Sequence, residues 1–239
     1  MKKILLVAGH INIKFNSLTA LHGSTGTAGE QELTIRITNR LSTVLRDRGF
    51  EVTQSDANAN DDPSITLKDF NLALALHGDM DVQKDQGGGM VGSGDKSVDA
   101  MWQESLRIKK VFDEVYFNET KIVNKNIVTD GMSKYYLWQY LSTNTPCVLI
   151  EMGQVLDPHD QVLLSNTDLI ANALGVAICK ALDVPFDIST QETPQEPSEG
   201  TTEPVPVPEV PVQTKKERIK IILEEIHEDI NEIVDIIFE

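Results

Sequence analysis

Three apolar runs of strand length each lead to an ionisable residue, and this pattern constrains the fold more than any other feature of the chain. Such continuous runs are typical of strands that are buried on both faces, as in a largely parallel sheet. The runs and the residues after them are Lys3 to Ala8 before Gly9-His10, Leu72 to Leu76 before His77, and Cys147 to Ile150 before Glu151. Because parallel strands end at one edge of a sheet, the three ionisable side chains are expected to share a polar pocket there.

Segments with helical spacing separate these runs. The first begins at Glu30, carries apolar residues three and four positions apart, and stops at Gly49. Further helices are predicted over 97–115 and 160–182. This alternation of buried strands with helices predicts an α/β domain of three layers, with a largely parallel, mixed central sheet flanked by helices.

The remaining segments of the domain have weaker patterns. A short strand is predicted over 50–53, and the glycines from Gly87 to Gly94 indicate a flexible loop. The aromatic-rich segment 135–141 is typical of a strand. Its aromatic residues could stack on sugars near the site or pack across strands within the sheet. These residues are Tyr135, Tyr136, Trp138 and Tyr140.

A change in composition divides the chain after the last predicted helix. Residues 1–187 are expected to form the folded domain, and residues 188–214, which are rich in Pro, Glu and Thr, to form an extended linker. Residues 215–239 are predicted to form a helix with an apolar heptad seam, made of Ile219, Leu223, Ile226, Ile230, Ile233 and Ile237. A lone helix of this length is marginal, so we expect homo-oligomerisation through it, as a trimer or tetramer rather than a dimer.

Charge and composition exclude several classes of partner. The net charge of −16 repels phosphate backbones, so nucleic acid is not an expected partner. No run approaches the roughly 18 apolar residues of a membrane-spanning helix. The only two cysteines, Cys147 and Cys179, lie in apolar surroundings and are interpreted as core thiols of a chain made in a reducing compartment.

The residues at the predicted strand ends are those of a catalytic zinc site. Two imidazoles and one carboxylate, with a fourth position left open, are a usual ligand set, and a further glutamate can serve as general base. His10 and His77 supply the imidazoles, while Glu30 opens the first helix and Glu151 follows the third strand. Each histidine taken alone could equally be a satisfied core residue.

Four short motifs, in order, make the chain similar to the zinc-dependent N-acetylmuramoyl-L-alanine amidases of bacteria and their phages. They are Ala8-Gly9-His10, Gly29-Glu30 with apolar residues behind it, Leu76-His77, and Pro146 to Gly153 around Glu151. The resemblance covers roughly residues 2 to 182 and implies hydrolysis of the bond between muramic acid and L-alanine in peptidoglycan.

The same resemblance implies the roles of the site residues. His10, Glu30 and His77 would bind one Zn²⁺, and Glu151 would be the catalytic carboxylate. Glu32 competes with Glu30 as a ligand, whereas Asp160 is not expected to be catalytic. The other histidines, His22, His159 and His227, match no role.

The chain departs from the family pattern beside the two histidines. Ile11-Asn12 follows His10 where glycines are common, and Gly78-Asp79 follows His77 where Ala-Asn is common. Gln154 stands where a Phe is usual after the Glu-x-Gly motif. These differences affect the expected contacts to the glycan and stem peptide more than the expected metal ligands.

Two other functions suit the same residues. A zinc peptidase that cuts the stem peptide would use the same ligand set, and a non-catalytic wall-binding module could retain the fold. The N-terminal apolar run is too short for a signal peptide. We therefore expect a phage endolysin that is made in the cytoplasm and reaches the wall after holin-type release, although a bacterial amidase remains an alternative.

Overall fold

The computed structural model describes residues 1–10, 29–79 and 87–186. The chain divides into two units, Met1–Thr190 and Gln191–Glu239. The expected linker 188–214 and the expected coiled-coil segment 215–239 lie outside the described residues, as do His22 and His227.

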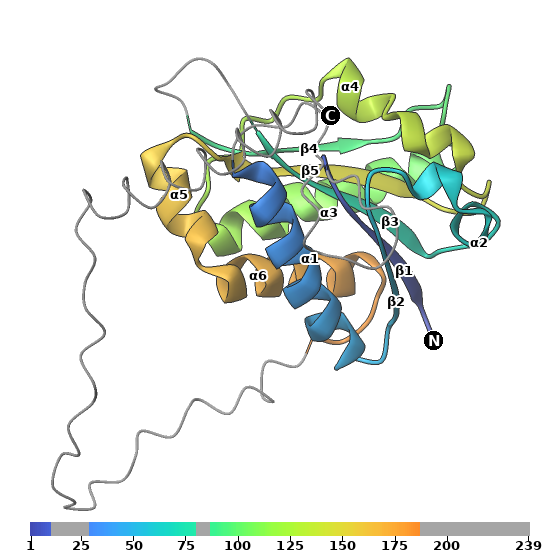
Figure 1. Cartoon of the computed structure of the whole chain (residues 1–239), viewed down its shortest axis with the longest axis horizontal. Coiled ribbons are helices and arrows are strands. Elements are labelled where there is room, and N and C mark those ends of the chain that lie inside the picture. Colours follow the sequence, from blue (N-terminus) through green and yellow to red (C-terminus); the bar gives the residue numbers. More distant parts are fainter. Residues whose placement is uncertain (11–28, 80–86, 187–239) are drawn as a thin grey trace, which may run out of the picture. The chain divides into compact units, whose positions relative to one another are not determined.

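A five-stranded sheet forms the centre of this unit (Figure 1). The strands, in spatial order, are β2 (Glu51–Ser55), β1 (Lys3–Ala8), β3 (Leu72–Asp79), β5 (Cys147–Gln154) and β4 (Met90–Ser93). The first four run parallel, whereas β4 pairs antiparallel with β5 at the edge. The mixed, mainly parallel α/β sheet predicted from the alternation of apolar runs and helices is thus confirmed.

Long helices cover one face of the sheet. They are α1 (Glu30–Arg46), α3 (Trp102–Thr120) and α6 (Thr167–Ala181), preceded by α5 (Pro158–Ser165). Their apolar stripes pack with the strand residues that point to this face, including Leu72, Leu74 and Leu76, in the larger of two hydrophobic cores. Burial of these regular stripes explains why periodicity alone located α1 and α3.

Short helical segments cover the opposite face. They are η1 (Ala59–Asp61), α2 (Pro63–Thr66), α4 (Asp130–Ser133) and η2 (Tyr136–Tyr140). They pack on the alternate residues of the same strands, such as Ala73 and Ala75, in a second, smaller core. Because successive strand residues point to opposite faces, His77 continues the row of Ala73 and Ala75, and Glu151 continues the row of Leu149.

Two sequence predictions are wrong on this face. Part of the predicted loop 87–94 is the strand β4, because Met90 and Val91 are buried against β5 despite the glycines around them. The predicted strand 135–141 is instead the 3₁₀ helix η2. Its buried residues are Leu137, Trp138 and Leu141, a helical spacing that the aromatic content of the segment obscured.

The last predicted helix, 160–182, is two helices. Asn166 separates α5 from α6, and its side chain accepts a hydrogen bond from the Leu169 amide and so caps α6. The two helices meet at 79°. Among the described residues, no single helix is long and apolar enough to span a membrane. The helices α5 and α6 reach that length and hydropathy only together, as this bent pair.

Candidate functional site

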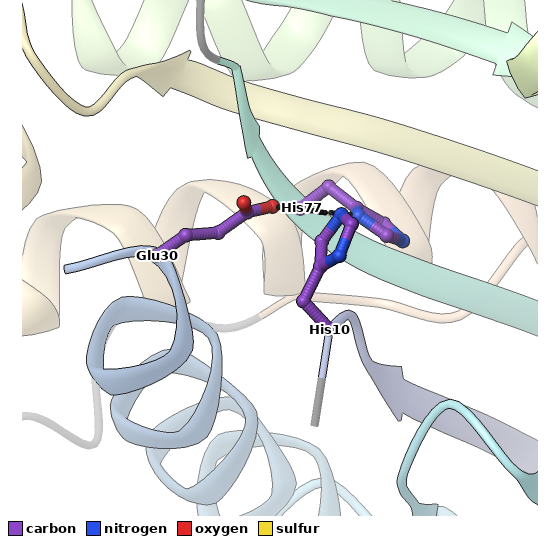
Figure 2. A group of neighbouring side chains, drawn as sticks. All are labelled: His10, Glu30 and His77. Atoms are coloured by element: carbon purple, nitrogen blue, oxygen red, sulfur yellow. Dashed lines mark ion pairs between the residues drawn. The ribbon is translucent and has the colours of Figure 1, made fainter. Parts of the chain in front are cut away.

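The predicted site residues converge where the parallel strands end. Gly9 and His10 directly follow β1, His77 lies near the end of β3, and Glu151 is its register partner on β5. Glu30 is the first residue of α1, whose N-terminus lies beside these strand ends. Figure 2 shows the side chains of His10, Glu30 and His77 pointing toward one another from three separate elements.

The three side chains have the spacing of a metal site. Oε1 of Glu30 lies 3.6 Å from Nε2 of His10 and 3.5 Å from Nδ1 of His77. One ligand atom from each residue lies within 4.8 Å of the other two. Ligand atoms about 2.0–2.1 Å from a tetrahedral zinc ion are about 3.4 Å apart, so small side-chain adjustments suit this trio to zinc.

The protonation states also suit metal binding. Burial lowers the pKa of His10, only partly opposed by Glu30, so its imidazole is held neutral. Burial works to raise the pKa of Glu30, but hydrogen bonds from His77 and the Gly78 amide, together with the nearby imidazoles, bring it below its ordinary value. A neutral imidazole and an ionised carboxylate are the forms that bind zinc.

Glu151 differs from Glu30 in its surroundings. Burial, opposed in part by His77, raises the pKa of Glu151 to about 7. The Oε2 atom of Glu151 and the Nε2 atom of His77 are both buried, and neither has a hydrogen-bond partner among the described residues. Unsatisfied buried polar atoms are typical of catalytic and ligand-binding sites rather than of packed cores. A carboxyl group of this kind can both accept and donate a proton near neutral pH.

Glycines make room for this arrangement. A Cβ atom on Gly9 would lie 2.4 Å from Cε1 of His77, so only glycine allows β1 to approach the imidazole. The next residue, His10, has a φ of 57°, in the left-handed region, which turns its side chain away from the strand direction. The site therefore depends on backbone features that are local to the Ala8-Gly9-His10 motif.

The competing residues lie elsewhere. Glu32 is exposed, whereas Glu30 is 3% exposed and within the trio. His159 is exposed and lies beside Asp160 in a second group with Asp157, but Asp157 caps α5. Asp160 is buried, and its Oδ2 accepts hydrogen bonds from the amides of Gly88 and Gln154. Its role is to join two backbone segments.

The site rim contains one residue that the sequence suggested and one that it missed. The ring of Tyr135, one of the aromatic residues interpreted as a sugar-stacking platform or as cross-strand packing, lies edge-on to that of His77, with centroids 5.5 Å apart, although it precedes the 3₁₀ helix η2 instead of lying in a strand. On the other side, Lys125 forms a mostly buried ion pair of 2.7 Å with Asp79 and is electrostatically close to Glu151. Asp79 stood out in the sequence only as a departure after His77, and no pattern marked Lys125.

Comparisons with known proteins bear on this geometry. The family model described as N-acetylmuramoyl-L-alanine amidase matches residues 4–183, which include the entire site. No curated protein sequence matches the chain significantly.

Solved structures of low sequence identity share the fold. The Ami1 amidase of Mycobacterium smegmatis is 19% identical, with a TM-score of 0.59, and the match covers 76% of this chain and 97% of that one. The CwlD amidase of Clostridioides difficile, solved in complex with the GerS lipoprotein, is 21% identical, with a TM-score of 0.56 and coverage of 77% and 100%. The catalytic domain of the CD27L endolysin, which targets Clostridia Difficile, is 13% identical, with a TM-score of 0.57 and coverage of 78% and 100%.

Proposed function

The chain belongs to the N-acetylmuramoyl-L-alanine amidase family, and on this premise we propose that it cleaves the amide bond between muramic acid and L-alanine with one zinc ion held by His10, Glu30 and His77. The observation that carries the zinc assignment is the convergence of these three side chains beside the partly buried Glu151. The ionisation states of His10 and Glu30 and the spacing of all three side chains fit the metal.

Bound zinc supplies Lewis-acid polarisation of the scissile carbonyl. Glu151 is the proton carrier: its carboxylate takes a proton from the attacking water and returns it to the nitrogen of the departing L-alanine. The Oε2 atom of Glu151 is buried, and the pKa of about 7 that burial gives this carboxyl group suits both transfers. The Gly78 amide orients Glu30 by donating to its Oε1 over 3.0 Å.

Product analysis tests the reaction. Metal content is measured on the purified protein, and digested peptidoglycan is examined by mass spectrometry. We expect about one zinc per chain and peptides that carry a free L-alanine amine. A cut within the stem peptide would instead support the zinc-peptidase alternative, and intact wall with no metal would support a non-catalytic wall-binding module.

We also propose that the chain acts as a phage endolysin, made in the cytoplasm and released to the wall through a holin-type pore. Its fold is similar to that of an endolysin catalytic domain as well as to bacterial amidases, so fold alone does not separate these roles. Expression with and without a holin, with Glu151→Gln as control, separates them. Lysis only with the holin supports the proposal, whereas a requirement for the chain in cell division points to a bacterial wall-remodelling amidase.

From the sequence pattern of residues 215–239, we propose that the chain self-associates through a coiled coil. Several catalytic domains on proline-rich linkers would then bind a polymeric wall with higher avidity. Light scattering compares the full chain with a truncation after Ile188. A monomeric full chain would overturn this proposal.

A further inference from the structure

The 3₁₀ helix η2 exposes one aromatic ring near the site. Leu137 and Trp138 in this helix are buried, whereas Tyr136 is 40% exposed. The ring of Tyr136 lies 4.7 Å from that of Tyr135, and their hydroxyl groups are hydrogen-bonded. Tyr135 is held in turn by the ring of Trp138, whose Nε1 donates to the Met132 carbonyl. Tyr136 is therefore a fixed ring with an exposed part, not a side chain free to reorient.

Tyr135 connects this exposed ring to the candidate metal site. The ring centroids of Tyr135 and His77 are 5.5 Å apart, so the ring of Tyr136 lies within about 10 Å of the His77 imidazole. This distance is within the span of a disaccharide. A sugar that adjoins the muramic acid at the scissile bond can therefore reach Tyr136.

The neighbours of Tyr136 are suited to hydroxyl groups. The carboxylates of Asp56 and Asp61, which follow β2, are close enough to affect the Tyr136 hydroxyl electrostatically. Carboxylates accept hydrogen bonds from sugar hydroxyl groups, and a tyrosine ring packs on the C–H face of a sugar. The combination of an aromatic face with adjacent acceptors is that of a carbohydrate subsite.

Charge distinguishes the two sides of the site. In peptidoglycan the lactyl carboxyl at the scissile bond is an amide, so the glycan there is uncharged and the carboxylates of Asp56 and Asp61 do not repel it. The stem peptide carries carboxylates, which these residues would repel. Lys125, whose charge acts on Glu151, lies on the opposite side, next to Gly89 before β4. The charges therefore favour glycan beside η2.

We propose that Tyr136, with Asp56 and Asp61, forms a glycan-strand subsite that binds the sugar next to the muramic acid. The inference rests on the amidase activity described above and adds a specificity-determining residue to it. Tyr136 acts on binding of the polymer and not on the proton transfers. Substrates that extend across the subsite gain from it, whereas a single-sugar substrate does not.

Kinetics on two soluble substrates with the same stem peptide test the subsite. One carries a single muramic acid and the other a tetrasaccharide. Tyr136→Ala should raise KM for the tetrasaccharide substrate roughly tenfold with little change in kcat, and should leave both constants for the single-sugar substrate unchanged. Tyr136→Phe retains the ring and should remain close to wild type. Tyr140→Ala is the matched control, because Tyr140 is 50% exposed on the same helix.

Other outcomes overturn the proposal. An equal loss on both substrates would mean that Tyr136 only supports Tyr135 and His77, and a KM that follows peptide length would assign the surface to the stem peptide. Titration of the wild type and Tyr136→Ala with the uncharged N-acetylglucosamine tetramer is independent of catalysis. Equal binding of the tetramer by the wild type and by Tyr136→Ala would exclude the subsite. Failure of the wild type to cut either substrate would instead contradict the amidase assignment, and the binding experiment would still test the subsite.

Discussion

The two faces of the sheet differ in what covers them. The helices α1, α3 and α6, which cover one face, have 15 to 19 residues each, whereas the segments on the other face have three to five. The long helices bury regular apolar stripes in the larger core. The short segments bury a smaller core on the face to which His77 and Glu151 point. The difference indicates that the helix-covered face supplies most of the stability, whereas the other face carries His77 and Glu151, and Glu30 reaches the site from the N-terminus of α1.

The strand β3 contributes to both the stability of the domain and the candidate metal site. Leu74 and His77 lie three residues apart on β3 and point to opposite faces. Substitutions at the two positions should therefore have separate effects, on stability for one and on metal binding and turnover for the other. The predictions below test this separation.

The largest effect is expected from His77→Ala. Loss of one of three ligands should reduce zinc content from about one per chain to near zero and abolish hydrolysis, while the unfolding midpoint stays close to that of the metal-free wild type. Metal analysis and a wall-digestion assay measure both. His159→Ala is the control, because this side chain is 69% exposed and outside the trio. Full zinc content in His77→Ala would remove His77 from the ligand set.

Glu151→Gln should retain zinc and lose activity by about a hundredfold or more, because the amide cannot carry the proton. Metal content and kcat on a soluble muropeptide are the measurements. Glu32→Gln, which changes an exposed glutamate, should match wild type. If Glu151→Gln also loses its metal, Glu151 is a ligand and the assigned roles are wrong.

Leu74→Ala tests the helix-covered face. Leu74 is fully buried, so its truncation should lower the free energy of unfolding by about 2–5 kcal/mol, while kcat and zinc content per folded chain are unchanged. Urea unfolding gives the stability, and Leu67→Ala, at an 83% exposed position, is the control. A selective loss of kcat would show that the two faces are coupled.

A smaller stability loss is expected from Asp160→Ala, at the edge of the site. Removal of its carboxylate leaves the amides of Gly88 and Gln154 without their acceptor, at a cost of about 1–3 kcal/mol. Asp130→Ala, whose carboxylate is exposed and only weakly paired with Lys134, should change stability by less than about 1 kcal/mol. Equal losses would contradict the joining role of Asp160.

The sequence predicted the regular part of the fold well. The runs before His10, His77 and Glu151 are strands, because residues buried on both faces must be apolar throughout. The helix from Glu30 was predicted from its apolar spacing. The same runs indicated that His10, His77 and Glu151 would meet, and the structure brings these three together with Glu30, the first residue of the predicted helix.

The irregular face was predicted poorly, for physical reasons. In segment 135–141, aromatic content favoured a strand, but tertiary packing of Leu137 and Trp138 against the sheet selected a 3₁₀ turn. The strand β4 contains Gly92, and its pairing with β5 is a long-range contact that no local pattern encodes. The ion pair of Asp79 with Lys125 joins residues 46 positions apart and was equally invisible.

The register pairing of His77 with Glu151 has a consequence for how such enzymes can diversify. Adjacent strands are about 4.8 Å apart, so the backbone ladder itself fixes the separation between a ligand and the proton carrier. The connection 56–61 can change in length or composition without moving either group, whereas segment 135–140 can change only at exposed positions such as Tyr136, because Tyr135 packs on His77. Changes at these positions should therefore redirect the enzyme to a different wall polymer without altering its reaction.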